Sequence, residues 1–286
     1  MPFFSFTLKD NINSLNYLNI NKNQIYYSKS TYIWKTINKE NNKQKFLIKR
    51  EKRQKFDDGV SKVLFFLPPS IGLGDSIEYA KAIKSIFERK IFSKIGIAFT
   101  DSYSFLFKKY FNLNLLYPYI ISSDEISQYD SFFHFTLEID ALRNQKYIRS
   151  NIEIEIKKYF KINNGENFVL NLKTKKKINK VSIFPISNSP IRTMPILLIK
   201  SLIDYLKKFF VIEVYVDKNS EISNLLLNDI KNKNIVIVDS VNKKELVKSV
   251  ESIEYGIFMD SGPLHIAKLF NKKGVLIESS VSSKML

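Results

Sequence analysis

The chain of 286 residues is long enough for two domains, and its 44% of hydrophobic residues is typical of a globular protein with a substantial core. It contains no cysteine, which excludes disulfides and thiol catalysis, and its two histidines are far apart in the sequence, so we expect no metal ion and no other cofactor. No apolar run has the length of a membrane helix, and residues 1–20 lack the pattern of a signal peptide, so we expect a cytoplasmic protein.

The formal net charge of +17 is concentrated in two segments. Residues 1–60 contain 12 Lys or Arg against 5 Asp or Glu, and residues 140–180 contain 11 against 4. The rest of the chain is close to neutral, so the charge lies on an extension and a connector rather than on a nucleic-acid-binding face, and we expect no nucleic-acid partner. A solvated basic surface and a peripheral attraction to the anionic inner face of the cytoplasmic membrane both remain open.

Residues 1–60 are polar and rich in Asn, Lys and Tyr. Partial strand-like alternation occurs at 25–34 and at 45–48. We assign this basic N-terminal extension no chemistry. The turn-prone residues at 57–59 end it, so a first domain is expected to occupy 61–180.

A strand, a glycine-containing loop and a helix follow the extension. The apolar run 62–67 predicts a buried strand, and Gly72 and Gly74 would let the backbone approach a ligand closely. The helix is expected to take Asp75 or Ser76 as its cap. A carboxylate in this position is either a helix cap or a base that faces a ligand, and the spacing leaves both interpretations open.

The rest of the first domain alternates between β and α patterns. A helical pattern occupies 103–111, and strands are expected at 95–99, 117–121 and 131–135. His134 lies in the last of these runs, where a histidine hydrogen-bonded within the core is the more common arrangement. Residues 140–180 are expected to connect this domain to the next.

Residues 181–286 show the same alternation of strand and helix patterns, which predicts a second domain. A strand at 181–185 and a loop precede Pro195, which suits the start of a helix. Further strands are expected at 211–216, 235–238, 255–259 and 274–277. The pattern predicts an α/β protein with two Rossmann-like domains that face each other across a cleft.

The stretch 255–270 combines a strand, a sharp turn and a helix start. Asp260, Ser261 and Gly262 break the strand, and glycine accepts backbone angles that other residues avoid. Pro263 suits the first helical position. The free N–H groups of such a helix start attract phosphate, but a well-capped turn without any ligand would show the same pattern.

Four segments stand out by their order in the chain. They are IGLGDSIE at 71–78, PISNSPIRTMP at 185–195, DKNSE at 217–221 and DSGPLHIA at 260–267. They resemble, in order, the G-[IL]-G-D loop, the strand and loop with a basic residue before Trp-Pro, the G-G-x-x-E turn and the D-[ST]-G-x-x-H-x-A signature of glycosyltransferase family 9, the ADP-heptose:lipopolysaccharide heptosyltransferases. The resemblance covers about residues 62–280 and implies a GT-B fold.

The resemblance also implies a role for each matching residue. Asp75 would be the catalytic base of an inverting transfer that needs no metal ion. Arg192 would lie near the donor phosphates, and Glu221 would contact the donor nucleoside. The ADP-linked sugar-nucleotide site would be lined by Asp260, Ser261, Gly262 and His265.

The chain departs from the family pattern at several positions. Met194 stands where the family has Trp, and Asp217 and Lys218 stand where it has paired glycines. The chain ends at Leu286, soon after the strand at 274–277, so the nucleotide-sugar domain is expected to be shorter than usual.

Two functions therefore remain in view. The first is an inverting glycosyltransferase that moves a heptose or similar sugar to a lipopolysaccharide or other surface-glycan acceptor. The second is a GT-B-like protein that binds a sugar nucleotide or glycan without turnover. A nucleic-acid-binding protein, the third class considered, would need aromatic and basic residues interleaved on one face.

Overall fold

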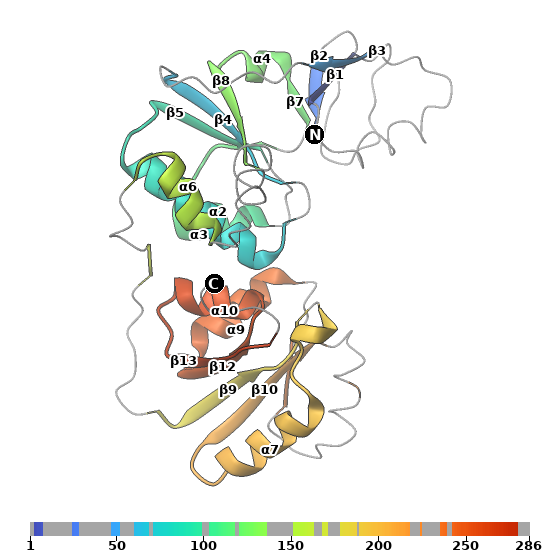
Figure 1. Ribbon diagram of the computed structural model, residues 1–286, viewed down its shortest axis with the longest axis vertical. Helices are drawn as coiled ribbons and strands as arrows, with labels where there is room; N and C mark the ends of the chain where they lie inside the picture. Colours follow the sequence, from blue (N-terminus) through green and yellow to red (C-terminus); the bar gives the residue numbers. More distant parts are fainter. Residues whose placement is uncertain are drawn as a thin grey trace. The chain divides into compact units, whose positions relative to one another are not determined.

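The computed structural model describes residues 3–7, 25–28, 47–51, 60–68, 71–98, 103–117, 120–135, 151–162, 168–170, 178–187, 189–217, 224, 235–238 and 242–279 (Figure 1). Contacts divide the chain into two compact units. The first contains residues 1–71 and 83–148, and the second contains residues 72–82 and 149–286.

Four parallel strands form one sheet of the first unit, in the order β6-β5-β4-β8. They are β4 (Lys62–Phe66), β5 (Lys94–Ala98), β6 (Leu116–Tyr117) and β8 (Ser131–His134). In β4 every residue after Lys62 is buried, as expected for a parallel strand that is covered on both faces. The helices α3 (Ser104–Phe111) and α4 (Ser123–Ile126) belong to this unit, and α2 (Leu73–Glu88) contributes residues to both units.

A second, antiparallel sheet contains the strands of the N-terminal segment. Its order is β3-β1-β2-β7, with β1 (Phe3–Thr7), β2 (Ile25–Ser28), β3 (Leu47–Glu51) and β7 (Ile120–Ser122). The strands β2 and β3 lie where the sequence alternates. Three of the four strands of this sheet thus come from the N-terminal segment, and β7 is the fourth.

The single strand expected at 117–121 is divided. β6 ends at Tyr117 in the parallel sheet, whereas β7 begins at Ile120 in the antiparallel sheet. Pro118 lies between them in the sequence, and proline cannot donate a ladder hydrogen bond. The expectation of one strand was wrong because an apolar run does not show which sheet each half joins.

Five parallel strands form the sheet of the second unit, in the order β11-β10-β9-β12-β13. They are β9 (Lys180–Phe184), β10 (Val211–Asp217), β11 (Ile235–Val238), β12 (Tyr255–Met259) and β13 (Gly274–Ile277). Numbered along the unit, the order is 3-2-1-4-5, that of a nucleotide-binding Rossmann sheet. The order reverses between β9 and β12, and ligands of such sheets bind at this switch point, beyond the carboxyl ends of the strands.

Helices alternate with the strands of the second unit. They are α6 (Ile152–Tyr159), the short 3-10 helix η3 (Pro190–Arg192), α7 (Ile196–Leu206), α9 (Lys243–Ser252) and α10 (Gly262–Leu269). The sequence also predicts a helix at roughly 220–230, a range that lies outside the described residues except for Asn224. None of the described helices is long and apolar enough to cross a membrane.

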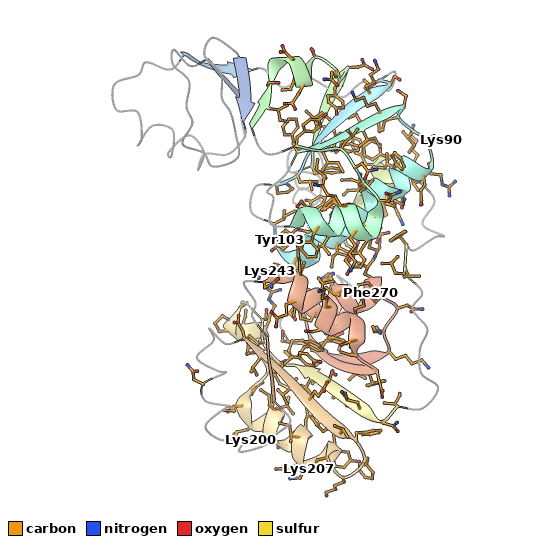
Figure 2. The ribbon with its side chains drawn as sticks, turned by 180° about the vertical axis from the view of Figure 1, so that it is seen from behind. Lys90, Tyr103, Lys200, Lys207, Lys243 and Phe270 are labelled. Atoms are coloured by element: carbon orange, nitrogen blue, oxygen red, sulfur yellow. The ribbon has the colours of Figure 1, made fainter. Side chains whose placement is uncertain are left out.

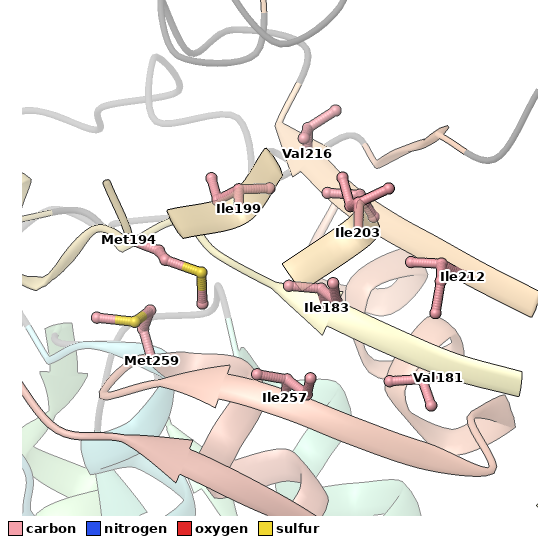
Figure 3. Packing of buried hydrophobic residues seen from close by; sticks show 10 residues of the cluster. Val181, Ile183, Met194, Ile199, Ile203, Ile212, Val216, Ile257 and Met259 are labelled. Carbon is pink, nitrogen blue, oxygen red and sulfur yellow. The ribbon is translucent and has the colours of Figure 1, made fainter. Parts of the chain in front are cut away.

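One hydrophobic core of the second unit lies between α7 and the sheet (Figure 3). Ile183 of β9 and Ile257 of β12 pack in one cluster with Ile199 and Ile203 of α7. Met194, at the position where family 9 has Trp, is buried in the same cluster. The unbranched side chain of methionine adapts to the space available, so Met194 fills this part of the core.

We predict that Ile199→Ala lowers the free energy of unfolding by roughly 2–5 kcal/mol, because the deletion leaves a cavity under α7. Ile199 is fully buried, whereas Leu197 on the same helix is 74% exposed. Leu197→Ala is therefore the matched control, with an expected change within about 0.5 kcal/mol. Urea unfolding of both variants measures the difference, and equal losses would contradict the described packing.

Candidate functional site

The turn after β12 leads directly into α10. β12 ends at Met259, and α10 begins at Gly262 with Pro263 in its first turn. Ser261, the N-cap residue, has extended backbone angles, and its side chain makes no capping hydrogen bond to the helix. Its hydroxyl instead donates to the carbonyl of Met259 at 3.3 Å. The helix start thus lies at the carboxyl end of β12 without a side-chain cap, although the Leu264 N–H donates to the Ser261 carbonyl at 3.1 Å.

Two of the predicted donor-binding residues form an ion pair across the switch point. Arg192 ends η3 after β9, and Asp260 follows the neighbouring strand β12. The Arg192 Nη1 donates to Asp260 Oδ2 at 3.2 Å. The side chain of Asp260 is 4% exposed and that of Arg192 is 35% exposed. The structure therefore brings together two residues that are far apart in sequence, and the guanidinium reaches solvent.

Gly262 does not have the backbone conformation that the sequence suggested. None of the glycines in the described part of the chain has a positive φ. A Cβ atom on Gly262 would instead lie 3.1 Å from Cδ2 of Leu73, which begins α2. The expectation of unusual backbone angles was wrong, and close approach of the two helix starts explains the glycine.

His265 lies along one face of α2. Its Nδ1 is 3.1 Å from Oε1 of Glu78. A Cβ atom on Gly74 would lie 2.5 Å from Cδ2 of His265 and 2.9 Å from its Nε2. Gly74 thus lets α2 approach a ring, not a bound ligand. All of these residues belong to the second unit.

Asp75 occupies the third position of α2 and is exposed. The helix begins at Leu73, so the expected cap at Asp75 or Ser76 was misplaced by three or four residues. The backbone N–H of Gly72 donates to Asp75 Oδ2 at 3.4 Å, and the Ser76 hydroxyl donates to the Gly72 carbonyl at 2.9 Å. The carboxylate thus accepts a long, local hydrogen bond at the helix start and is also open to solvent.

The sequence motifs do not indicate a buried chain of side chains that we call the ionic chain. Lys157, Glu153, Lys81 and Glu78 alternate in charge, and the imidazole of His265 ends the chain on Glu78. The Nζ atoms of Lys157 and Lys81 lie 2.5 Å and 2.6 Å from the two oxygens of Glu153. Lys81 Nζ is also 3.6 Å from Glu78 Oε2. Glu153 and Lys157 have the four-residue spacing of a helical ion pair, but that spacing is usually found on exposed faces.

The ionic chain controls the protonation of Glu78. Burial raises its pKa, but the hydrogen bond with His265 and the positive charge of Lys81 outweigh burial and lower the pKa from 4.5 to about 2. On the next turn of α10, burial lowers the pKa of Lys268, against the charge of Glu78. Phe270, labelled in Figure 2, follows this helix as its C-cap residue.

The remaining predicted residues add little to this geometry. Glu221 lies outside the described residues, and so do the side chains of His134 and Lys218. Within the described ranges, no three His, Asp or Glu side chains are grouped as they would be around a metal ion.

The first unit contains a hollow of about 790 Å³ that includes none of the predicted site residues. It is lined by Val60, Ser61, Phe87, Glu88, Lys90, Ile91, Phe92 and Ser93. These residues lie before β4, at the end of α2 and between α2 and β5, at the amino ends of the strands. Ligands of parallel α/β sheets bind at the opposite edge, so this hollow does not decide the function.

Comparisons with known proteins agree on the fold. No family model and no curated protein matches the sequence. Among solved structures, the Escherichia coli heptosyltransferase WaaC with ADP has a TM-score of 0.54 at 8% identity, over 77% of this chain and 88% of that chain. A family 9 glycosyl transferase from Veillonella parvula DSM 2008 has a TM-score of 0.55 at 11% identity, over 78% and 87%.

A third similar structure is the dodecameric, iron-containing glycosyltransferase TibC from enterotoxigenic E. coli H10407. Its TM-score is 0.53 at 12% identity, over 95% of this chain and 73% of that chain. The protein thus has an α/β fold with two parallel sheets, that of the GT-B glycosyltransferases of family 9. Identities of this size show the fold, and the chemistry has to be argued from the residues.

We predict that Gly74→Ala destabilises the protein, although alanine in a helix is ordinarily favoured over glycine by roughly 0.5–1 kcal/mol. The new methyl group would overlap the ring of His265, and overpacking of this kind costs about 1–3 kcal/mol. Thermal unfolding measures the effect. In a His265→Ala background the same substitution should become neutral or stabilising, and a loss of equal size there would contradict the contact.

Proposed function

We propose that this protein is an inverting glycosyltransferase that moves a heptose or similar sugar from an ADP-linked donor to a lipopolysaccharide or other surface-glycan acceptor. The observation that carries the proposal is the pairing of Arg192 with Asp260 at the switch point of a Rossmann sheet, next to the start of α10. A guanidinium and a helix N-terminus are both donors to phosphate oxygens.

In the proposed reaction the acceptor hydroxyl oxygen attacks the anomeric carbon from the face opposite the diphosphate. The bond from that carbon to the diphosphate oxygen breaks, and the hydroxyl proton passes to the carboxylate of Asp75. The nucleoside diphosphate leaves with the negative charge. Arg192 and the start of α10 stabilise it, and these donors do not require a metal ion.

The acceptor is proposed to be a glycolipid at the cytoplasmic face of the membrane. The basic segments 1–60 and 140–180 support this location, because Lys and Arg are attracted to anionic headgroups. One observation favours the non-catalytic alternative, a protein that binds a sugar nucleotide or glycan without turnover. The carboxylate of Asp75 accepts from the Gly72 N–H, as a helix cap does.

We predict that Asp75→Asn lowers the transfer rate by about 10²–10⁴ while the protein stays folded and binds the donor. The amide oxygen can still accept from Gly72, but the side chain cannot take up a proton. A radiolabelled-sugar transfer assay measures the rate, circular dichroism the folding, and calorimetric titration the donor binding. Asp204→Asn, which removes an exposed carboxylate from α7, is the control. A wild-type rate in Asp75→Asn would leave Asp75 as a cap only.

We predict that Arg192→Ala weakens binding of ADP-sugars by roughly 10- to 150-fold, the loss of one charge-assisted hydrogen bond. Arg192→Lys should retain part of the affinity because it keeps the charge. Removing the arginine also leaves the buried Asp260 without this partner, so the double variant Arg192→Ala/Asp260→Asn is needed as a control. Calorimetric titration compares the three proteins, and unchanged affinity in Arg192→Ala would remove this residue from the donor site.

A further inference from the structure

The imidazole of His265 spans one turn of α2. Gly74 and Glu78 are four residues apart and therefore lie on the same face of that helix. The Nδ1 edge of the ring is at Glu78, and the edge formed by Cδ2 and Nε2 is at Gly74. Asp75 is the next residue along the helix from Gly74. The ring thus has one nitrogen on a buried carboxylate and the other in the first turn of α2.

The chemistry of Glu78 decides which ring nitrogen carries the proton. Glu78 is buried and has a pKa of about 2, so it is ionised at neutral pH. An ionised carboxylate only accepts hydrogen bonds, so Nδ1 must donate. In a neutral imidazole this leaves the lone pair on Nε2. Within the described part of the chain, no hydrogen bond to Nε2 is found.

The ionic chain holds Glu78 in place. Lys81 from α2 lies between Glu78 and Glu153 of α6, and Lys157 of α6 binds the other oxygen of Glu153. Lys268 of α10 is the further charged group that faces this cluster. Because each carboxylate has a cationic neighbour, Glu78 cannot turn away from His265 without leaving a buried charge with a poorer partner.

We propose that Glu78 is a positioning residue that fixes His265 as the Nδ1–H tautomer and presents Nε2, at the first turn of α2, as an acceptor for a hydroxyl group of the bound sugar. The proposal rests on the function proposed above. It extends that function by naming the residue that orients His265 and the ligand group that His265 binds. A sugar offers many hydroxyl donors, whereas a fully ionised diphosphate offers acceptors only.

Nitrogen NMR of the wild-type protein tests the tautomer directly. The chain has only two histidines, so the His265→Gln spectrum assigns the imidazole signals. At a pH where the imidazole is neutral, we expect the Nδ1–H form of His265 to dominate. Dominance of the Nε2–H form in the wild type would overturn the proposal, whether or not any variant folds.

Glu78→Leu removes the acceptor, and we expect the Nδ1–H form to lose its dominance. Glu88→Leu, an exposed carboxylate on the same helix, is the matched control and should leave the tautomer unchanged. In a transfer assay Glu78→Leu should lower kcat by about 10- to 100-fold through misplacement of the ring, with Glu88→Leu unaffected. An unchanged tautomer in folded Glu78→Leu would show that Glu78 does not position the ring.

Titration with two probes tests the ligand group. We expect the Nε2 signal of His265 to move with ADP-glucose but not with ADP. An equal response to both compounds, or no response to ADP-glucose, would overturn the assignment to a sugar hydroxyl. Calorimetry in the same buffer distinguishes failure of the sugar-hydroxyl assignment from failure of the proposed function. A protein that binds neither ADP nor ADP-glucose contradicts the proposed function. The tautomer of His265 is measured independently of both.

Discussion

The ionic chain is the constraint on which the candidate site depends. Four side chains from α6 and α2 alternate in charge in a largely buried part of the second unit, and His265 of α10 ends this series on Glu78. Desolvation of each charge is offset only while its neighbours stay in place, and removing one partner from a buried pair typically costs 3–5 kcal/mol. The ionic chain therefore fixes the first turn of α2 against α10, and this fixes the positions of Asp75 and His265.

Close packing between the starts of α2 and α10 also constrains the candidate site. Gly74 makes room for the ring of His265, and Gly262 makes room for Leu73. Neither glycine is needed for its backbone angles. Any larger residue at these two positions would separate the helix starts that carry the proposed base and the proposed phosphate site. Gly74 and Gly262 are therefore explained by close contact between segments of the protein itself.

Most strands could be predicted because parallel strands buried on both faces are continuous apolar runs, as at β4, β9 and β12. The pairing of β1, β2 and β3 with β7 could not be predicted, since strand partners are set by contacts far apart in the sequence. The candidate site could likewise be predicted only in part. The motifs located Arg192 and Asp260, but no spacing rule indicates that Glu78 and Glu153 are buried, because charged residues at helical intervals usually face solvent.

We propose that a nucleotide diphosphate binds at the carboxyl ends of β9 and β12. Asp260 holds the guanidinium of Arg192 beside the start of α10, so a diphosphate would meet an oriented cation and the positive end of a helix dipole. A crystal structure of the protein with ADP tests this most directly. The account predicts diphosphate oxygens within hydrogen-bonding distance of Arg192 and the first turn of α10. ADP bound in the hollow near Phe87, or a fully soaked crystal without ordered ADP, would contradict it.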